Sequence, residues 1–229
     1  VFFLVEGDGS EFLNDSHQKI SLTYMTDYVG SYDRYIESVD NVVMPSKHFA
    51  EYYNKTSNKN VYLGSPKYDI TIDNENTIKK YNLTKNKKAL FIFPRRRDLS
   101  RIDLLKIYDV VAAAGFELLV KSRGKDPAPP HLRGDYYFED ESWFPHTTME
   151  LISLSDLIIN FDSTVIKECI LLKKPFINFH IKPFDIRLDF LYKYKYCKAF
   201  NSDYDVKNVE KAIEYLTNKN FNSEFDMVV

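Results

Sequence analysis

The chain has 229 residues, of which 44% are hydrophobic and 15% aromatic, so it can bury a core in one or two domains and is neither disordered nor fibrous. Its formal net charge of −2 gives no general attraction for nucleic acid, so an anion site must come from a local cluster of cations. The two cysteines, Cys169 and Cys197, exclude a disulfide framework and favour a reducing compartment.

The beginning of the chain does not resemble a targeting segment. It reads VFFLVEGDGSEF, which has no basic region before its apolar residues and is typical of a strand whose predecessors are missing. No apolar run reaches the roughly 18 residues of a membrane span. We therefore expect a fragment or shortened version of a longer protein, located in the cytoplasm.

The first 70 residues alternate short apolar runs with polar segments. After the opening strand and a polar stretch, the sequence predicts a buried strand from 39 to Pro45, a helix that begins at about Ser46, and a strand at 59–69 that closes in a Gly-Ser-Pro turn at Gly64. The polar segment 71–88 is interpreted as the link to a second domain. This pattern predicts a partial Rossmann-like domain over 1–70 and a second domain over 71–229.

From Lys88 onward, apolar strands and helices alternate regularly. Strands are predicted at 89–94, 116–121, 135–140, 157–161 and 175–179, and helices at 100–115, 147–155, 163–174 and 205–219. Ser100 is the expected N-cap of the first of these helices, and Thr147 with Glu150 forms a capping box for the second. Continuous apolar strands separated by helices predict a doubly wound α/β domain with a parallel sheet.

The junction between the strand at 157–161 and the next helix carries polar residues suited to an anion. Asp162 makes the turn, and a helix that begins at Ser163 or Thr164 would offer two hydroxyls and free backbone amides to a phosphate. Glu168 lies one turn beyond Thr164 and could accept hydrogen bonds from a ribose. The alternative is that Asp162 and Ser163 merely cap the helix while Glu168 faces solvent.

Cations follow the first two strands of the same domain. Arg95, Arg96 and Arg97 come directly after the strand at 89–94, and Lys121, Arg123 and Lys125 come at the end of the strand at 116–121. Because the carboxyl ends of parallel strands meet at one edge of a sheet, these side chains should face the turn at Ser163. Arginine suits phosphate, so the sequence predicts a diphosphate site rather than three unrelated solvated clusters.

At this point the sequence resembles a known family. The segment MELISLSDLIINFDSTVIKECILLKKPFINF, residues 149–179, is similar to the nucleotide-binding half of GT-B glycosyltransferases, in particular the CDP-glycerol glycerophosphotransferase-like enzymes and the UDP-N-acetylglucosamine 2-epimerases. Residues 87–98 and 61–69, which include Gly64, resemble further motifs of the glycerophosphotransferases. The resemblance begins near residue 39 and reaches the C-terminus.

The resemblance implies a metal-independent transferase without a resident cofactor. Its donor would be a nucleotide-sugar or CDP-glycerol, and its acceptor a glycan or polyol-phosphate of a surface polysaccharide or teichoic-acid-like polymer. The donor nucleotide would contact Arg95, Arg97, Arg123, Asp162, Ser163, Thr164, Glu168 and Gly64. Catalysis would involve Arg96 and Lys121 as charge stabilisers and His17 as the base that deprotonates the acceptor.

The sequence departs from this family in ways that leave alternatives open. Ser122 stands where the glycerophosphotransferases carry a histidine, and the Ser-Gly-Gly of the epimerases is absent after Asp162. An epimerase-like isomerase could draw carboxylates from Glu6, Asp8 and Glu11. A non-catalytic nucleotide- or glycan-binding remnant is the third alternative.

Two aromatic segments have functional as well as structural interpretations. Trp143 or Phe144 could stack on a nucleobase, although a buried core position is the usual place for a tryptophan. The segment 184–200, rich in aromatic residues and lysines, is predicted to pack as a long loop, and a peripheral contact with a membrane or polymer is its alternative interpretation. Cys169 is expected in the core.

Overall fold

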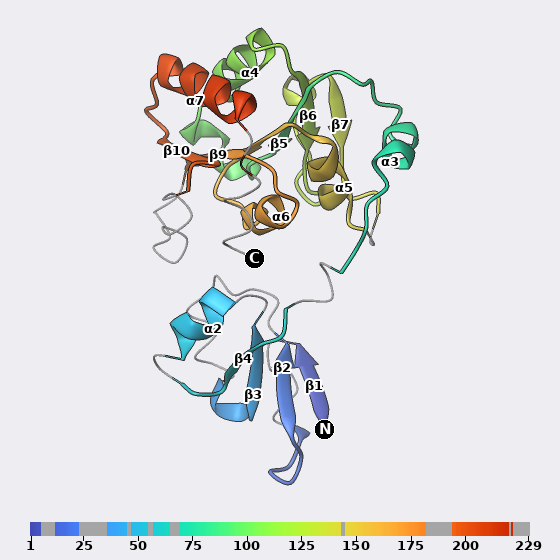
Figure 1. Cartoon of the computed structure of the whole chain (residues 1–229), viewed down its shortest axis with the longest axis vertical. Coiled ribbons are helices and arrows are strands. Elements are labelled where there is room, and N and C mark those ends of the chain that lie inside the picture. The colour runs from blue at the N-terminus through green and yellow to red at the C-terminus, as the bar shows by residue number, and fades with distance from the viewer. Residues whose placement is uncertain are drawn as a thin grey trace. The chain divides into compact units, whose positions relative to one another are not determined.

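The computed structural model describes residues 1–5, 12–22, 36–44, 47–54, 57–64, 69–142, 145–181, 194–219 and 221. The chain divides into two compact units, Val1–Ile70 and Thr71–Val229. Each unit contains a parallel sheet with helices packed on it (Figure 1). The predicted α/β class with Rossmann-like parallel sheets is confirmed.

The first unit is a four-stranded parallel sheet in the order β1-β2-β3-β4. The strands are Phe2–Val5, Lys19–Leu22, Asn41–Met44 and Asn60–Tyr62, with a 3-10 turn, η2, at Ile36–Ser38 and the helix α2 at Lys47–Tyr53. Val42 and Met44 of β3 are fully buried, and Ala50 and Tyr53 of α2 are buried with them. Strand β2 lies inside the stretch that the sequence marked as polar.

The second unit has a six-stranded parallel sheet in the order β10-β9-β8-β5-β6-β7. Its strands are Lys88–Ile92 (β5), Glu117–Lys121 (β6), Tyr136–Phe138 (β7), Leu157–Asn160 (β8), Phe176–His180 (β9) and Cys197–Asn201 (β10). Every residue of β5 and β8 is buried, as expected of central strands covered on both faces. Strand β10 begins inside the segment 184–200, which was predicted to be a loop, and ends one residue beyond it.

Helices cover both faces of this sheet. They are α3 (Asn74–Lys80), α4 (Leu104–Ala113), α5 (Thr147–Leu154), α6 (Ile166–Leu171) and α7 (Val206–Asn218), with 3-10 turns η4 (Arg96–Arg101) and η5 (Pro130–Leu132). Figure 1 shows α4 and α7 on one face and α5 and α6 on the other. This arrangement follows from right-handed crossovers that run in one direction from β5 and in the other from β8.

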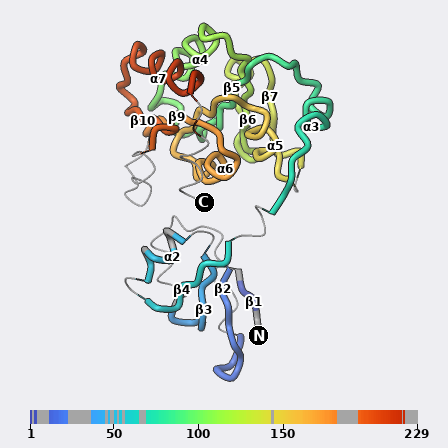
Figure 2. Tube along the Cα trace, viewed as in Figure 1, coloured from blue at the N-terminus to red at the C-terminus, as the bar shows by residue number. Residues whose placement is uncertain are grey.

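The predicted link at 71–88 contains a helix, α3, that was not predicted. Helix α3 packs beside α5, although the two helices are far apart in the sequence (Figure 2). Glu150 of α5 is buried and accepts hydrogen bonds from the Tyr81 hydroxyl at 2.5 Å and from Lys80 Nζ at 2.7 Å. Because burial and the Glu150 carboxylate both disfavour a phenolate, the pKa of Tyr81 is raised.

Two predicted helix caps are wrong, because another residue caps each helix. Helix α4 is capped by Asp103, whose carboxylate accepts from the amide of Lys106 at 3.1 Å, and Ser100 lies in the preceding 3-10 turn. The capping box of α5 does not form, because Glu150 is committed to α3. His146 caps α5 instead, with its ring nitrogen accepting from the amide of Thr148.

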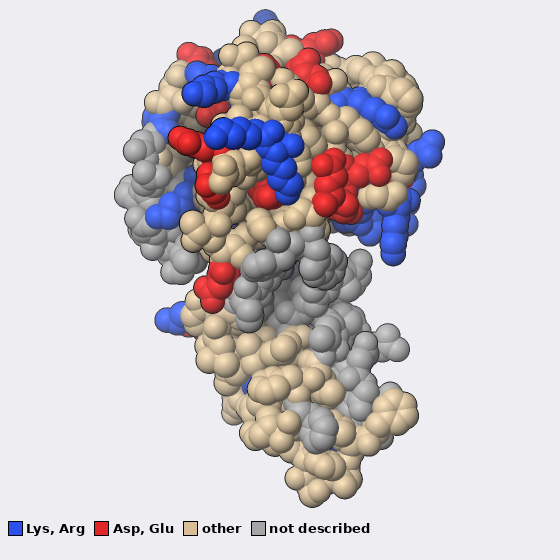
Figure 3. All heavy atoms as spheres, turned by 90° about the vertical axis from the view of Figure 1, so that its right-hand side faces the viewer, with Lys and Arg blue, Asp and Glu red and all other residues tan. Residues whose placement is uncertain are grey.

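The surface of the molecule carries charges of both signs. On the face in Figure 3, Lys and Arg side chains are interspersed with Asp and Glu side chains, consistent with a net charge near zero. Within the described part of the chain, no helix has the length and apolar character needed to cross a membrane.

Candidate functional site

The carboxyl edge of the second sheet has the topology of a ligand site. The chain runs from β5 to β6 on one side and later places β8 on the other side of β5. Phe91 pairs with Ile159, and Ile92 with Lys121, so the three strands end at nearly the same level. In open parallel sheets, ligands bind at such a switch point, outside the carboxyl ends of the strands.

The loops after β5 and β6 bring together most of the predicted cations. The Arg96 amide donates a hydrogen bond of 2.9 Å to Asp126 Oδ2, and the Asp126 amide donates to the Arg123 carbonyl at 2.9 Å. The two loops are therefore tied to each other. Arg95 is half-buried, whereas Arg96, Arg97 and Arg123 are exposed.

Three of these cations lack a counter-charge in the part of the chain that the structure describes. Among the described residues, the side chains of Arg95, Arg96 and Arg123 have no hydrogen-bond or ion-pair partner, while Arg97 Nε lies 3.9 Å from Asp98 Oδ2. Uncompensated guanidinium groups on neighbouring loops favour binding of an anion.

Lys121 differs from the arginines because its charge is already neutralised. The side chain is 6% exposed, and Nζ contacts Asp140 Oδ1 just beyond β7. Burial would raise the pKa of Asp140, but the hydrogen bond and charge of Lys121 outweigh it and lower the pKa below its usual value. Ser122, the departure from the family pattern, is buried with its hydroxyl 2.6 Å from that of Tyr137.

The turn after β8 is held rigidly by its neighbours. Asp162 has a positive φ of 48°. Its Oδ1 accepts a hydrogen bond from Asn178 Nδ2 at 3.0 Å and lies 3.0 Å from His180 Nδ1, and its Oδ2 accepts from the Ile181 amide at 2.7 Å. Asn160 Nδ2 binds both Asn178 Oδ1 and the Ser163 carbonyl. Asp162 is thus a structural anchor of this turn.

Ser163 and Thr164 lie in that turn rather than in a helix. Helix α6 begins at Ile166 and has no side-chain cap, so the predicted start at Ser163 or Thr164 is wrong by two or three residues. The Ser163 carbonyl accepts from Asn160 Nδ2 at 3.0 Å and from the Ile166 amide at 3.5 Å, and the Thr164 carbonyl accepts from the Lys167 amide, so these residues make turn bonds rather than helical ones. Among the described residues, the hydroxyls of Ser163 and Thr164 have no hydrogen-bond partner and are available to a ligand.

Glu168 and Cys169 lie in the interior. Glu168 is 7% exposed, so it does not face solvent as the alternative interpretation expected. Cys169 is fully buried, as predicted, and burial raises the pKa of its thiol well above the usual value. Only the small exposed part of the Glu168 side chain would be accessible to a ribose.

The remaining predicted site residues lie in the first unit or outside the described residues. His17 is half-buried, and its amide donates to the Asn14 carbonyl at 3.1 Å. Gly64 follows β4 with φ +79°, and a Cβ added there would meet no atom within 4 Å. The outlying candidates are Glu6, Asp8, Glu11, Trp143 and Phe144, together with Ser46 and residues 182–193 of the aromatic segment.

Several residues of this edge were not identified from the sequence. Four of them are Asp98, Arg101, Asn178 and His180. Asn178 and His180 gave a signal, since polar residues at the end of an otherwise apolar strand call for a partner. Asp98 and Arg101 gave none, because an acidic residue in a run of arginines reads as ordinary surface.

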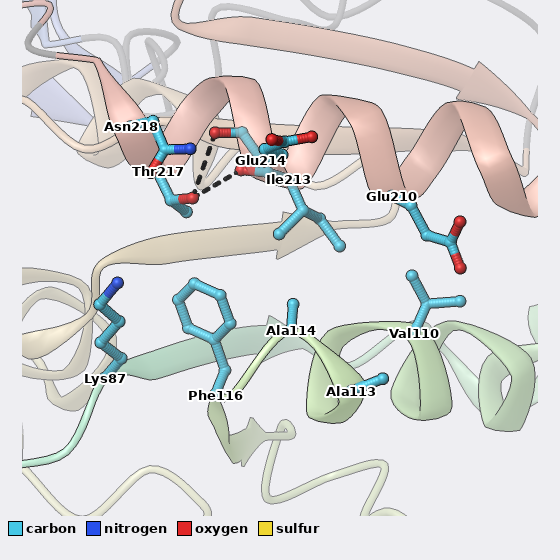
Figure 4. Close-up of a pocket in the computed structure, with 10 residues that line it drawn as sticks. All are labelled: Lys87, Val110, Ala113, Ala114, Phe116, Glu210, Ile213, Glu214, Thr217 and Asn218. Carbon is cyan, nitrogen blue, oxygen red and sulfur yellow. Dashed lines mark hydrogen bonds between the residues drawn. The ribbon is translucent and has the colours of Figure 1, made fainter.

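A separate pocket of about 420 Å³ lies between α4 and α7 (Figure 4). Its lining includes Lys87 and Phe116, which precede β5 and β6, so the pocket lies at the amino edge of the sheet. Glu210 and Glu214 are among its lining residues, and their negative charges disfavour a diphosphate. Among the described residues, no group of three or more His, Cys, Asp or Glu side chains is arranged to hold a metal ion.

The sequence and the structure give different results when compared with known proteins. No family model and no curated protein matches the sequence. Among solved structures, the wall teichoic acid polymerase TagF soaked with CDPG matches with a TM-score of 0.62 and 13% identity, over 98% of this chain and 66% of TagF. The UDP-GlcNAc 2-epimerase of Methanocaldococcus jannaschii, in complex with UDP-GlcNAc and UDP, matches with a TM-score of 0.62 and 13% identity, over 92% and 64%.

A third match comes from a structure of accessory secretory proteins 1, 2 and 3 of Streptococcus pneumoniae, with a TM-score of 0.56 and 16% identity over 98% of this chain and 47% of that chain. This chain thus spans less than two thirds of each of the three structures. At these identities the likeness shows the fold. The GT-B-like fold expected from residues 149–179 is confirmed: this chain shares its fold with the TagF and 2-epimerase structures.

Proposed function

We propose that the protein is a transferase that moves a glycosyl or glycerophosphate group from a nucleotide-diphosphate donor to a surface-polysaccharide or teichoic-acid-like acceptor. The observation that supports this most strongly is the meeting of three loops at the switch point. Within the described part of the chain, the loops after β5 and β6 present cations without counter-charges, and the turn after β8 presents hydroxyls of Ser163 and Thr164 that have no partner. Cations and hydroxyl donors on one edge suit a diphosphate.

The proposed chemistry places new negative charge on the nucleotide. Glycosyl transfer breaks the sugar–phosphate bond and releases a nucleoside diphosphate, whereas glycerophosphate transfer breaks the phosphoanhydride and releases a nucleoside monophosphate. In either case Arg95, Arg96, Arg97 and Arg123 would stabilise the departing phosphate, with Ser163 and Thr164 donating hydrogen bonds. These side chains would take the part that a divalent cation plays elsewhere.

Other residues would have supporting roles. Lys121 is bound to Asp140, so we assign it to holding the end of β6 rather than to direct contact with phosphate. Glu168 would accept a hydrogen bond from the ribose. His17 of the first unit would deprotonate the acceptor hydroxyl, which then attacks the donor.

Calorimetric titration with CDP-glycerol, UDP-GlcNAc, CDP and UDP tests donor binding. Arg96→Ala should weaken binding of the preferred nucleotide by about tenfold, the effect of one charge-assisted hydrogen bond. Lys207→Ala on α7 removes an exposed cation elsewhere and is the matched control. Equal affinities of wild type and Arg96→Ala, or no binding of any of the four nucleotides, would refute the proposed donor site.

The fold match to a UDP-GlcNAc 2-epimerase supports a second candidate, an isomerase that uses the same edge. Incubation with UDP-GlcNAc and no acceptor separates the two functions. Formation of the 2-epimer without an acceptor would replace the transferase proposal. Nucleotide binding without turnover, with or without glycan and polyol-phosphate acceptors, would instead indicate a binding protein.

A further inference from the structure

The turn after β5 contains a buried carboxylate that the proposed chemistry does not use. Asp98 is 4% exposed and lies in η4, and its Oδ2 has no hydrogen-bond partner among the described residues. Arg97 Nε is 3.9 Å from Oδ2, and Arg101 Nη1 is 3.8 Å from Oδ1, so both are ion pairs without a hydrogen bond. A buried carboxylate in this state is costly and calls for an explanation.

Arg101 connects this carboxylate to the turn after β8. Its Nη1 donates a hydrogen bond of 2.9 Å to the carbonyl of Ile181, just beyond β9. The amide of the same Ile181 donates to Asp162 Oδ2 at 2.7 Å. Because β8 lies between β5 and β9, Arg101 joins the loops on its two sides. The guanidinium therefore binds the same residue, Ile181, whose amide fixes the turn bearing Ser163.

Arg101 retains donors for a ligand. Its side chain is 54% exposed, and its Nε and Nη2 have no partner among the described residues. The planar guanidinium presents its donors as a fork that matches two phosphate oxygens. With Nη1 held by Ile181 and by the charge of Asp98, the remaining donors have a restricted direction.

We propose that Arg101 is a phosphate-binding residue of the candidate site and that Asp98 is a positioning residue that acts through Arg101. Asp98 restricts the guanidinium so that it lies beside the Asp162 turn before the ligand arrives, which reduces the ordering cost of binding. This inference rests on the proposed function, because it assumes that the phosphate belongs to a nucleotide. The binding of phosphate by Arg101 can nevertheless be tested without the nucleoside.

The sign of one substitution separates positioning from simple charge. Asp98→Asn removes a negative charge next to an anion site, so if Asp98 acts by charge alone, the variant binds phosphate more tightly. If Asp98 positions Arg101, the same variant binds phosphate more weakly, because the guanidinium is no longer held. If Asp98 has a merely structural role, the affinity for phosphate does not change as long as the variant is folded.

The experiment measures binding of inorganic pyrophosphate and of UDP and CDP to wild type, Asp98→Asn, Arg101→Lys and the double variant. Arg101→Lys keeps the charge and removes the fork at an exposed position, where unfolding is not expected. Arg133→Lys is the matched control, because Arg133 also donates to a backbone carbonyl, Ala128 O at 3.1 Å, but precedes β7 at the amino edge. Circular dichroism checks that each variant is folded.

We expect Asp98→Asn and Arg101→Lys each to weaken pyrophosphate binding by about tenfold, and the double variant to be no weaker than the weaker single variant. Arg133→Lys should bind as wild type does. Unchanged or tighter binding by Asp98→Asn, or fully additive losses in the double variant, would overturn the positioning role.

The outcomes also distinguish this inference from the proposed function. If wild type binds pyrophosphate but neither nucleotide, the donor proposal fails while the Asp98–Arg101 pair is still judged on pyrophosphate. If the nucleotides bind and the variants match wild type, the pair is refuted and the donor site stands. Binding of none of the three ligands would refute both.

Discussion

The amide of Ile181 donates a hydrogen bond of 2.7 Å to Oδ2 of Asp162, which ties the residue after β9 to the turn after β8. Asn178 and His180, both on β9, contact the other oxygen of the same carboxylate. The carboxylate of Asp162, a residue with a positive φ, therefore receives three contacts from β9 and the residue that follows it. These contacts determine where the hydroxyls of the candidate site lie.

Asp162→Ala should lower the free energy of unfolding by about 3 kcal/mol. Alanine at a positive φ costs about 1 kcal/mol, and the donors left without an acceptor add about 2 kcal/mol. Asn82→Ala is the control, because Asn82 is exposed and has a φ of 51°, so it carries the backbone cost alone. Urea unfolding of both variants measures the difference, and equal losses would show that the three contacts do not stabilise the turn.

The sheet of the second unit could be predicted because its central strands are continuous apolar runs. Burial on both faces leaves such runs few alternatives, and strand alternation with helices then specifies a parallel order. This was sufficient to place Arg95, Arg123 and Ser163 on one edge. Strand β2, by contrast, lies in a polar stretch, and β10 lies in a segment rich in lysines, so neither showed an apolar pattern.

Other features could not be predicted because tertiary partners decide them. Glu150 had the spacing of a capping box, but Tyr81 and Lys80 compete for its carboxylate. Ser163 had the chemistry of an N-cap, but its carbonyl is bound by Asn160 from the preceding strand. Asp98 became informative only through its burial. Sequence spacing predicts hydrogen bonds between residues that are near each other in the chain. The contacts described here join residues from different helices and strands, so spacing cannot predict them.

Gly134→Ala should destabilise the protein more than Gly115→Ala. Both glycines have a positive φ, which costs an alanine about 1 kcal/mol. A Cβ at Gly134 would lie 2.7 Å from the Leu118 carbonyl oxygen, whereas a Cβ at Gly115 meets no atom within 4 Å. Overpacking adds about 1–3 kcal/mol at Gly134 alone. Denaturant midpoints compare the two variants, and a loss at Gly115 as large as that at Gly134 would contradict the close approach to β6.

The stability of the second unit should fall in alkali partly through Tyr204. Burial, together with the nearby Asp103, raises the pKa of Tyr204 from 10.0 to about 12, and its hydroxyl donates to the Asp103 carbonyl at 3.0 Å. Because the folded state holds the proton more tightly, this contribution is complete below pH 10.0 and is lost as the pH rises toward 12. Tyr204→Phe should therefore show a shallower loss between pH 9 and pH 11 in unfolding measurements; parallel curves would argue against the shift.

Breaking the contact between Lys121 and Asp140 should cost more than removing both partners. Asp140→Asn leaves the ammonium of Lys121, 6% exposed, without a carboxylate and should lower the free energy of unfolding by about 1–3 kcal/mol, reduced from the fully buried case because Asp140 is 45% exposed. Adding Lys121→Met should restore part of that loss, because the buried charge is gone. The pKa of Asp140 lies below the usual 3.8, so its contribution is present above that pH and is lost as the pH falls through the folded-state value. Wild type should thus lose more stability than Asp140→Asn between pH 5 and pH 3. For the buried charge, a double variant that is less stable than Asp140→Asn would refute the account.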